Sequence, residues 1–226
     1  SLADKYSLKI LADAAQSFGA QTNNQKVGTF GDATATSFFP AKPLGCYGDG
    51  GAIFTDNDKL AEKIQSLRIH GQGLDKYHNV NIGINGRLDT LQAAVLIEKL
   101  NIFEDELSAR QQVADNYNNA LQNTAMVPKL NTGSTSSWAQ YTIRVSNRAA
   151  LQEACQQAGI PTAIYYPIPL NKQQAYKHFP TVKSGVPISE RISQEVISLP
   201  MHPYLSKEDQ ITICDTVKKA LQQKAA

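Results

Sequence analysis

Apolar positions in the first part of the chain alternate between short runs and one longer periodic segment. Three short runs, at residues 8–12 (LKILA), 33–39 (ATATSFF) and 51–55 (GAIFT), are bounded by Gly, Pro or polar residues. They predict buried strands of an α/β sheet. Residues 2–6 read as a short helix, and residues 58–69 repeat their apolar positions with a period of about 3.6 residues, which predicts another helix.

A longer helical pattern follows at residues 88–121, with a possible break at residues 101–104. Its apolar positions predict a stripe that faces a core, formed by Leu91, Ala94, Val95, Ile97 and Leu100. We interpret this region as a helical connector between two domains.

The pattern changes after the connector. A polar linker at residues 131–137 (NTGSTSS) leads to a predicted strand at 138–145, and a helix at 149–158 is expected to end at Gly159. Two prolines keep residues 165–170 (YYPIPL) extended. Helices are predicted at 189–197 and 207–223. The chain is therefore expected to divide at residue 122, with residues 1–122 in a large domain and residues 123–226 in a smaller α+β domain.

Composition and charge exclude several classes of protein. The chain has 226 residues, of which 42% are hydrophobic and 19% charged, and a net charge of +2. The basic residues are scattered, so we expect no nucleic-acid partner. The sequence contains no run of about 18 apolar residues, so we expect no membrane span. Three widely separated cysteines show neither disulfide nor metal-ligand spacing, which fits a cytoplasmic protein without a metal site.

Lys42 lies between Pro40 and Pro43, after an apolar strand and before a glycine-rich stretch. The prolines restrict the backbone around it, and the glycines permit close approach of other groups. A constrained lysine in surroundings of low dielectric can act as a nucleophile towards an aldehyde. The alternative is a solvated surface lysine in a turn.

Two further polar residues lie where predicted strands end. Asp13 follows the first strand, where open α/β sheets place ligands, and its carboxylate could hold a pyridinium nitrogen. It could equally be the N-cap of a helix. Ser37 could bind a phosphate or be an ordinary hydroxyl at a strand end.

Three segments in this order resemble the DegT/DnrJ/StrS-type aminotransferases: DAAQSFGA at residues 13–20, SFFPAKPLG-x-YGDGGA at 37–52, and IGINGRLDTLQAA at 82–94. The resemblance extends through most of the chain, including YYPIPL and SLPMHPYL. It implies the C-terminal part of a fold type I PLP-transferase large domain, with a mixed, mostly parallel sheet, followed by a smaller α+β domain. Members are longer than this chain, so we expect the N-terminal part of the large domain to be missing.

The resemblance also implies roles for individual residues around pyridoxal 5'-phosphate. Lys42 would bind the cofactor covalently and move the proton, and Asp13 would pair with the pyridine nitrogen. Gln16 would contact the ring or its O3' oxygen, and Ser37 would bind the phosphate. Asn85 resembles the asparagine that reaches the partner's phosphate in a homodimer with shared active sites; its alternative role is that of a turn residue before Gly86.

The resemblance implies transamination of a nucleotide-linked keto sugar, UDP-linked as in UDP-2-acetamido-3-oxo-glucuronate-type aminotransferases. The expected donor is glutamate, released as 2-oxoglutarate, and the amino sugar would serve glycan or polysaccharide biosynthesis. Tyr165 and Tyr166 could line the sugar pocket or pack a domain junction, and His70 could face the site or be structural. Asn171 stands where similar relatives carry histidine.

Two other functions fit the same segments. One is a sugar dehydratase that uses pyridoxal or pyridoxamine phosphate; retention of Lys42 argues against it, because relatives of that kind can replace this lysine with histidine. The other is a non-catalytic, cofactor-binding fragment. Uptake of pyridoxal phosphate on Lys42 would distinguish an enzyme from such a fragment.

Overall fold

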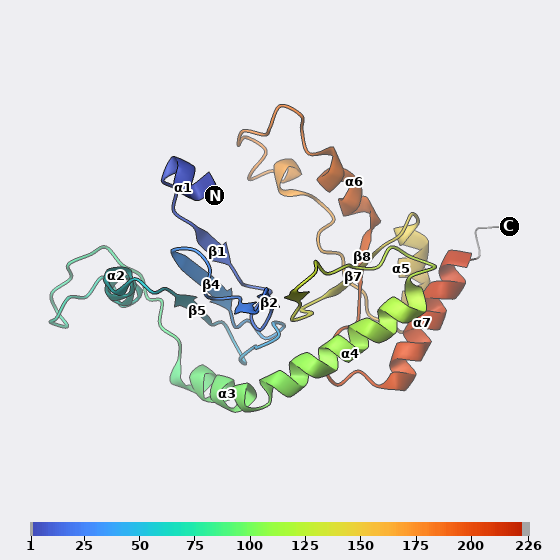
Figure 1. Ribbon diagram of the computed structural model, residues 1–226, viewed down its shortest axis with the longest axis horizontal. Coiled ribbons are helices and arrows are strands. Elements are labelled where there is room, and N and C mark those ends of the chain that lie inside the picture. The colour runs from blue at the N-terminus through green and yellow to red at the C-terminus, as the bar shows by residue number, and fades with distance from the viewer. Residues whose placement is uncertain (1, 223–226) are drawn as a thin grey trace. The chain divides into compact units, whose positions relative to one another are not determined.

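The computed structural model describes residues 2–222, and their contacts divide the chain into two compact units (Figure 1). The first unit runs to Leu107 and includes Asn131–Ala139, and the second consists of Ser108–Leu130 and the chain from Gln140 onward. Along the chain, the boundary between the units therefore falls inside a helix, and the segment Asn131–Ala139 beyond that helix belongs to the first unit. Two folding domains divided at residue 122 stay a prediction.

The main sheet of the first unit has three strands in the order β1-β4-β5. These are β1 (Leu11–Asp13), β4 (Ala33–Ser37) and β5 (Gly51–Phe54). β1 and β4 are parallel, whereas β4 and β5 are antiparallel. The sheet is mixed, as predicted, and α2 (Asp58–Arg68) follows it with Asn57 as its N-cap. A predominance of parallel strands stays a prediction.

Only the central strand of this sheet is buried as the sequence predicted. Thr34 and Thr36 of β4 are buried, but Leu11 of β1 is 71% exposed and Ile53 of β5 is 50% exposed. The first predicted strand also begins later than expected, at Leu11 instead of residue 8. The apolar runs were correctly identified as strands, but β1 and β5 are the two outer strands and lack the cover that full burial requires.

The polar linker predicted at residues 131–137 is part of a second small sheet. β6 (Ser134–Thr135) pairs with β2 (Gln21–Thr22), which also pairs with β3 (Gln25–Lys26). The pairing of β2 with β6 joins segments more than 110 residues apart, so sequence composition alone did not predict it. The strand expected at 138–145 is correspondingly shorter, because β7 spans Tyr141–Arg144.

Two helices form the predicted connector, α3 (Thr90–Asn101) and α4 (Phe103–Leu121), and the break falls at Ile102 as expected. The predicted core-facing stripe on α3 is wrong for this chain. Leu91 is 81% exposed and Ile97 59% exposed, and only Leu96 of α3 is buried. A periodic apolar face shows that a helix covers something, but it does not show that the partner is in the same chain.

The second unit contains an antiparallel pair of strands, β7 and β8 (Val196–Leu199), together with several helices. These are α5 (Arg148–Gln157), the short 3-10 helix η1 (Leu170–Lys172), α6 (Pro187–Glu195) and α7 (Lys207–Gln222). The helix predicted at 189–197 is wrong at its end, because residues 196 and 197 belong to β8. All four β8 residues are buried. Pairing with β7 overrides the helical pattern there.

Two tyrosines mark the core of the second unit. Tyr117 donates a hydrogen bond from its hydroxyl to the Pro200 carbonyl, and Tyr141 donates one to the Asn118 side chain at 2.6 Å. Burial raises the pKa of both phenols above its ordinary value.

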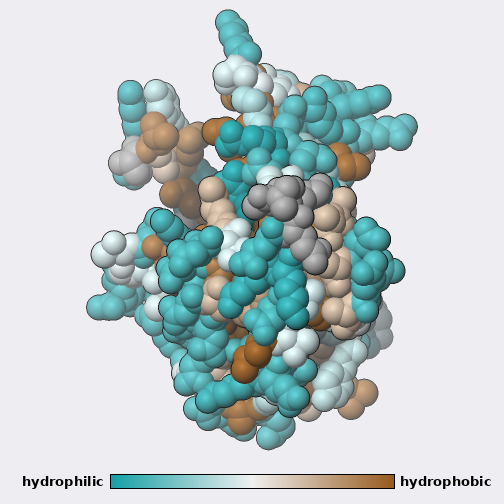
Figure 2. Space-filling model, turned by 90° about the vertical axis from the view of Figure 1, so that its right-hand side faces the viewer, coloured by the Kyte–Doolittle hydropathy of each residue, from teal (hydrophilic) through white to brown (hydrophobic). Residues whose placement is uncertain are grey.

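Amphipathic helices leave polar groups outside, and the face drawn in Figure 2 is mostly hydrophilic, with apolar residues in small groups.

The remaining element is α1 (Leu2–Tyr6), which confirms the predicted N-terminal helix. No buried residue belongs to it. Among the helices that the structure describes, none is both long and apolar enough to cross a membrane.

Candidate functional site

Asp13 and Ser37 lie at the carboxyl ends of neighbouring parallel strands. Asp13 pairs with Ala35, and Ser37 is two residues further along β4. Paired residues, and residues two apart, share one face of a sheet, so Asp13 and Ser37 are on the same face with Cα atoms roughly 8 Å apart. The fold therefore brings a carboxylate and a hydroxyl to the edge where open α/β sheets bind ligands.

The segment after Asp13 is a series of turns and not a helix. The Asp13 carboxylate accepts a hydrogen bond from the Ala15 amide at 3.0 Å, as in an Asx turn. The alternative of a helix N-cap at Asp13 is therefore wrong. The turn fastens to β4, because the Ala14 amide donates to the Ala35 carbonyl at 2.7 Å. Gln16 follows in the same turn, with an exposed side chain.

Phe18 connects this turn to the core of the first unit. Its ring contacts those of Phe38, Phe54 and Phe103, with centroid separations of 6.2, 6.1 and 5.6 Å. At Gly19, where φ is +91°, an added Cβ would lie 2.8 Å from Leu107. The turn is therefore packed as well as hydrogen-bonded, which restricts the backbone that carries Asp13.

Lys42 lies in a tight loop directly after β4. Its amide donates to the Phe39 carbonyl at 2.9 Å, and an added Cβ at Gly45 would lie 2.7 Å from the carbonyl oxygens of Phe39 and Pro40. Gly45 is therefore required by the close approach of two backbone segments. Lys42 is half-buried, and its amine makes no hydrogen bond or ion pair with any residue in the described range 2–222.

Cys46 closes the same loop. Its Sγ donates to the carbonyls of Phe38 and Gly48, both at 3.1 Å, and the residue is 1% exposed among Leu44, Leu96 and Phe103. Cys46 is a small buried residue of the core that supports the Lys42 loop.

His70 and Asn85 lie side by side in the segment between α2 and α3. An isolated bridge joins Ile69 to Asn85, and the His70 amide donates to the Ile84 carbonyl at 2.9 Å. Gly71 allows this fold, because an added Cβ would lie 1.8 Å from the Asn81 carbonyl oxygen. Both His70 and Asn85 are exposed. In the described part of the chain, no hydrogen bond joins either of them to Lys42, Asp13, Gln16 or Ser37.

Tyr165 and Tyr166 belong to the second unit and are exposed, with their rings in an edge-to-face arrangement 5.5 Å apart. The segment that follows them is tied to α6. Asn171 donates to the Glu190 carboxylate at 3.1 Å, and the Lys172 amine contacts the same oxygen at 3.1 Å. These two contacts hold the pKa of Glu190 below its usual range.

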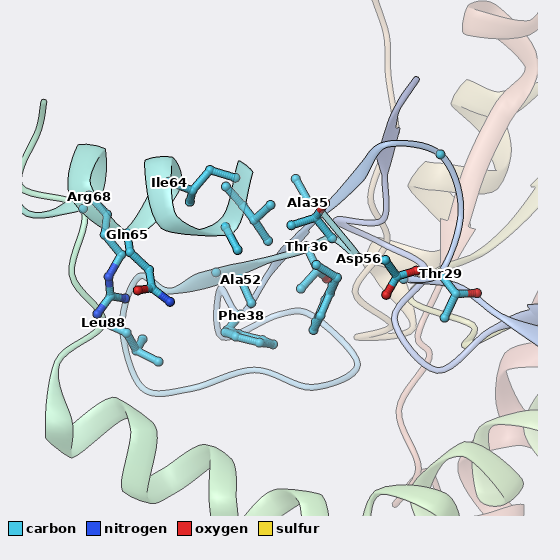
Figure 3. Close-up of a pocket in the computed structure, with 18 of the residues that line it drawn as sticks. Thr29, Ala35, Thr36, Phe38, Ala52, Asp56, Ile64, Gln65, Arg68 and Leu88 are labelled. Carbon is cyan, nitrogen blue, oxygen red and sulfur yellow. The ribbon is translucent and has the colours of Figure 1, made fainter. Parts of the chain in front are cut away.

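A large cavity in the first unit does not contain these residues. It has a volume of about 1080 Å³ and lies between α2 and the strands β4 and β5 (Figure 3). Its lining is mainly small or apolar, and its two charged side chains, Arg68 and Asp56, lie at opposite ends. None of the eight predicted site residues lines it, so the site prediction rests on the strand ends and not on this cavity.

Two hydroxyl groups near the site were not predicted to matter. Thr36 Oγ1 donates to the Ala14 carbonyl at 3.0 Å, and Ser137 Oγ donates to the Gln16 carbonyl at 3.1 Å. Thr36 directly precedes the segment at residues 37–52 that resembles the family, and its contact with Ala14 follows from the register of β1 and β4. Ser137 lies 121 residues from Gln16, and no sequence signal connects them.

Comparison with known proteins identifies the family of this chain. Residues 1–218 match the model of the DegT/DnrJ/EryC1/StrS aminotransferase family. A UDP-2-acetamido-2-deoxy-3-oxo-D-glucuronate aminotransferase from Pseudomonas aeruginosa is 46% identical over 215 residues, which cover 95% of this chain and 59% of that protein. A dTDP-3-amino-3,6-dideoxy-alpha-D-galactopyranose transaminase from Aneurinibacillus thermoaerophilus is 40% identical over 96% of this chain and 60% of that protein.

Solved structures lead to the same family. An aminotransferase of this family from Brucella abortus has a TM-score of 0.95 at 50% identity, covering 97% of this chain and 59% of that one. DesV from S. venezuelae, solved with a ketimine intermediate, has a TM-score of 0.91 at 34% identity, covering 96% and 59%. The chain thus spans about three fifths of the length of the relatives it matches. The chain belongs to the DegT/DnrJ/EryC1/StrS aminotransferase family.

Proposed function

We propose that the intact protein is a pyridoxal-phosphate-dependent aminotransferase that converts a nucleotide-linked keto sugar to an amino sugar, with glutamate as the donor. One observation carries the proposal. Asp13 and Ser37 share one face at the carboxyl ends of β1 and β4. Lys42, whose amine is unpaired within residues 2–222, follows on a constrained loop. Family membership and the nucleotide-sugar relatives support it.

The residues at the strand ends fit the cofactor that this family uses. An amine, a carboxylate and a hydroxyl are the groups that an aldehyde, a pyridine nitrogen and a phosphate require. When bound, pyridoxal phosphate supplies an aldehyde that links to amines and a protonated ring that accepts an electron pair. Lys42 would hold the aldehyde, and Ser37 would donate a hydrogen bond to the phosphate.

The chain's own groups then account for the proton movements of transamination. Asp13, held by the Ala15 amide, would keep the proton on the ring nitrogen by charge pairing. Once the amino donor has displaced it, Lys42 would take the proton from the donor carbon and deliver it to the C4' carbon of the cofactor, acting as base and then acid. Gln16 would orient the ring from the same turn.

We also propose that the active unit is a homodimer. The exposed stripe on α3 continues in the segment before it, where Leu74, Tyr77 and Ile82 are at least 89% exposed. Apolar surface of this kind marks an interface, and a second copy of the chain is the proposed occupant. Asn85 lies in the same segment and would reach the phosphate of the partner, with His70 beside it.

The substrate is proposed to be a UDP-linked 3-keto sugar of the glucuronate type, because the Pseudomonas relative at 46% identity acts on such a compound by name. Tyr165 and Tyr166 would offer apolar faces and hydroxyl donors to the sugar. Asn171 is engaged with Glu190, which holds the segment after these tyrosines near α6.

Borohydride trapping tests the proposal in the intact protein. Pyridoxal phosphate should produce a visible absorbance band, and reduction followed by peptide mapping should place the label on Lys42. Lys42→Arg keeps the charge but should take no label, whereas Lys59→Arg on α2 should label like the wild type. Label on another lysine contradicts the site assignment.

Product analysis tests the reaction itself. With glutamate and a UDP-linked keto sugar, the wild type should form 2-oxoglutarate and amino sugar in equal amounts. Loss of a hydroxyl from the sugar without consumption of glutamate supports a dehydratase instead. No cofactor uptake by the wild type supports a non-catalytic protein.

A further inference from the structure

The turn that carries Asp13 and Gln16 is held by hydroxyl groups on two sides. Thr36 on β4 donates to the Ala14 carbonyl at 3.0 Å, and Ser137 donates to the Gln16 carbonyl at 3.1 Å. Thr36 is 8% exposed and Ser137 only 1% exposed. Removal of the Ser137 hydroxyl leaves the Gln16 carbonyl without its partner among the described residues, whereas the Ala14 carbonyl also accepts from the Ser17 amide at 3.1 Å.

The Ser137 contact is the less expected of the two, because the chain reaches it only after α3, α4 and the segment beyond them. The position of Ser137 is set by the ladder between β2 and β6. Gly133 accepts a hydrogen bond from the Asn23 amide at 2.7 Å, and the backbone of β6 pairs with β2 in the register Gln21 with Thr135 and Thr22 with Ser134. Because β6 pairs with β2 in this register, Ser137, two residues after β6, lies next to the Gln16 carbonyl.

We infer that Ser137 is a positioning residue for the cofactor-facing turn: through the Gln16 carbonyl it sets where Gln16 and Asp13 lie relative to β4. This inference rests on the proposed function, since Asp13 and Gln16 are cofactor contacts only in that proposal. In that proposal Ser137 acts through the Gln16 carbonyl on the backbone of the turn, and contacts neither cofactor nor substrate itself. A displacement well below 1 Å matters for groups that must align with a ring.

Ser137→Ala in the intact protein tests the inference, with Ser134→Ala as the matched control. Both variants remove one hydroxyl from the same segment, but the Ser134 hydroxyl contacts Thr22 and not the turn. Ser137→Ala should weaken pyridoxal phosphate binding by about fivefold to tenfold, the effect of one buried hydrogen bond. Ser134→Ala should stay within about twofold of the wild type.

Two further readouts separate positioning from a general loss of structure. Without cofactor, amide exchange of residues 14–20 should accelerate in Ser137→Ala and not in Ser134→Ala. The pH midpoint of the cofactor absorbance band should shift by about half a unit in Ser137→Ala alone, because it depends on how Asp13 meets the ring.

The outcomes are distinguishable. If the wild type binds the cofactor on Lys42 and Ser137→Ala binds it equally well with an unchanged pH midpoint, the inference is overturned and the proposed function stands. If the wild type takes up no cofactor, both are overturned. Equal effects of Ser137→Ala and Ser134→Ala on cofactor affinity also overturn the inference, because they assign the effect to the segment as a whole.

Discussion

Removal of the Cys214 thiol should make the second unit less sensitive to alkaline pH. Cys214 lies on α7 and is 5% exposed. Burial raises the pKa of its thiol from 9.0 to about 11; Lys218 acts in the opposite direction and Asp215 adds to the increase. The folded state therefore prefers the neutral thiol, whereas the unfolded chain ionises it two pH units earlier.

The sign and size of the effect follow from this difference. A raised pKa contributes stability that is complete below pH 9, the pKa in the unfolded chain, and is lost as the pH rises through the folded value near 11. At pH 10.5 the thiol is mostly ionised in the unfolded chain and mostly neutral in the folded state. The free energy of unfolding should therefore fall by about 2 kcal/mol relative to pH 8 because of this group alone.

Urea unfolding at pH 8 and pH 10.5, followed by circular dichroism, measures the effect. The wild type should lose about 2 kcal/mol more than Cys214→Ala between the two pH values. Cys155, whose pKa burial also raises, acts in both proteins and cancels in the comparison. The pKa values of Tyr117 and Tyr141 are raised mainly by burial, and a smaller part of that increase comes from Cys214. Ile213→Val, a change to the neighbouring core residue without a titratable group, should keep the pH dependence of the wild type. An equal loss in the wild type and Cys214→Ala would refute the reasoning.

Three other changes test the loop, the core and the interface. Gly45→Ala places a Cβ 2.7 Å from two backbone oxygens and should weaken cofactor binding in a spectral titration roughly tenfold or more. In the control Gly48→Ala the new Cβ meets only the flexible Gln92 side chain, at 3.1 Å, so this variant should bind the cofactor normally. Equal binding by both variants would contradict the steric argument. Leu151→Ala empties a fully buried site and should cost about 3 kcal/mol in chemical denaturation, and a loss below about 1 kcal/mol would mean that the site collapses. Ile97→Glu on the exposed face of α3 should convert the proposed dimer to a monomer in sedimentation without loss of helix. The control Ile211→Glu, at an exposed position on α7, should leave the dimer intact. A wild-type protein that sediments as a monomer would contradict the proposed interface.

The sequence by itself determined most secondary structure and the identity of the chemical groups. Helical periodicity located α2, α3, α4, α5 and α7 and the break at Ile102, because side chains three and four apart must share a face whatever they pack against. The motif around Lys42 identified the family, and the apolar runs located β1, β4 and β5.

Tertiary structure alone decided which of these surfaces are buried and which distant segments meet. Residues 196 and 197 became strand because β7 was available to pair with them. The α3 stripe stayed exposed because none of the residues 2–222 covers it. The Ser137 contact with Gln16 depends on the register of β6 against β2. Local sequence patterns report the preferences of neighbouring residues. Pairing between strands more than a hundred residues apart is fixed only when the whole unit folds, because it depends on the packing of all the intervening elements.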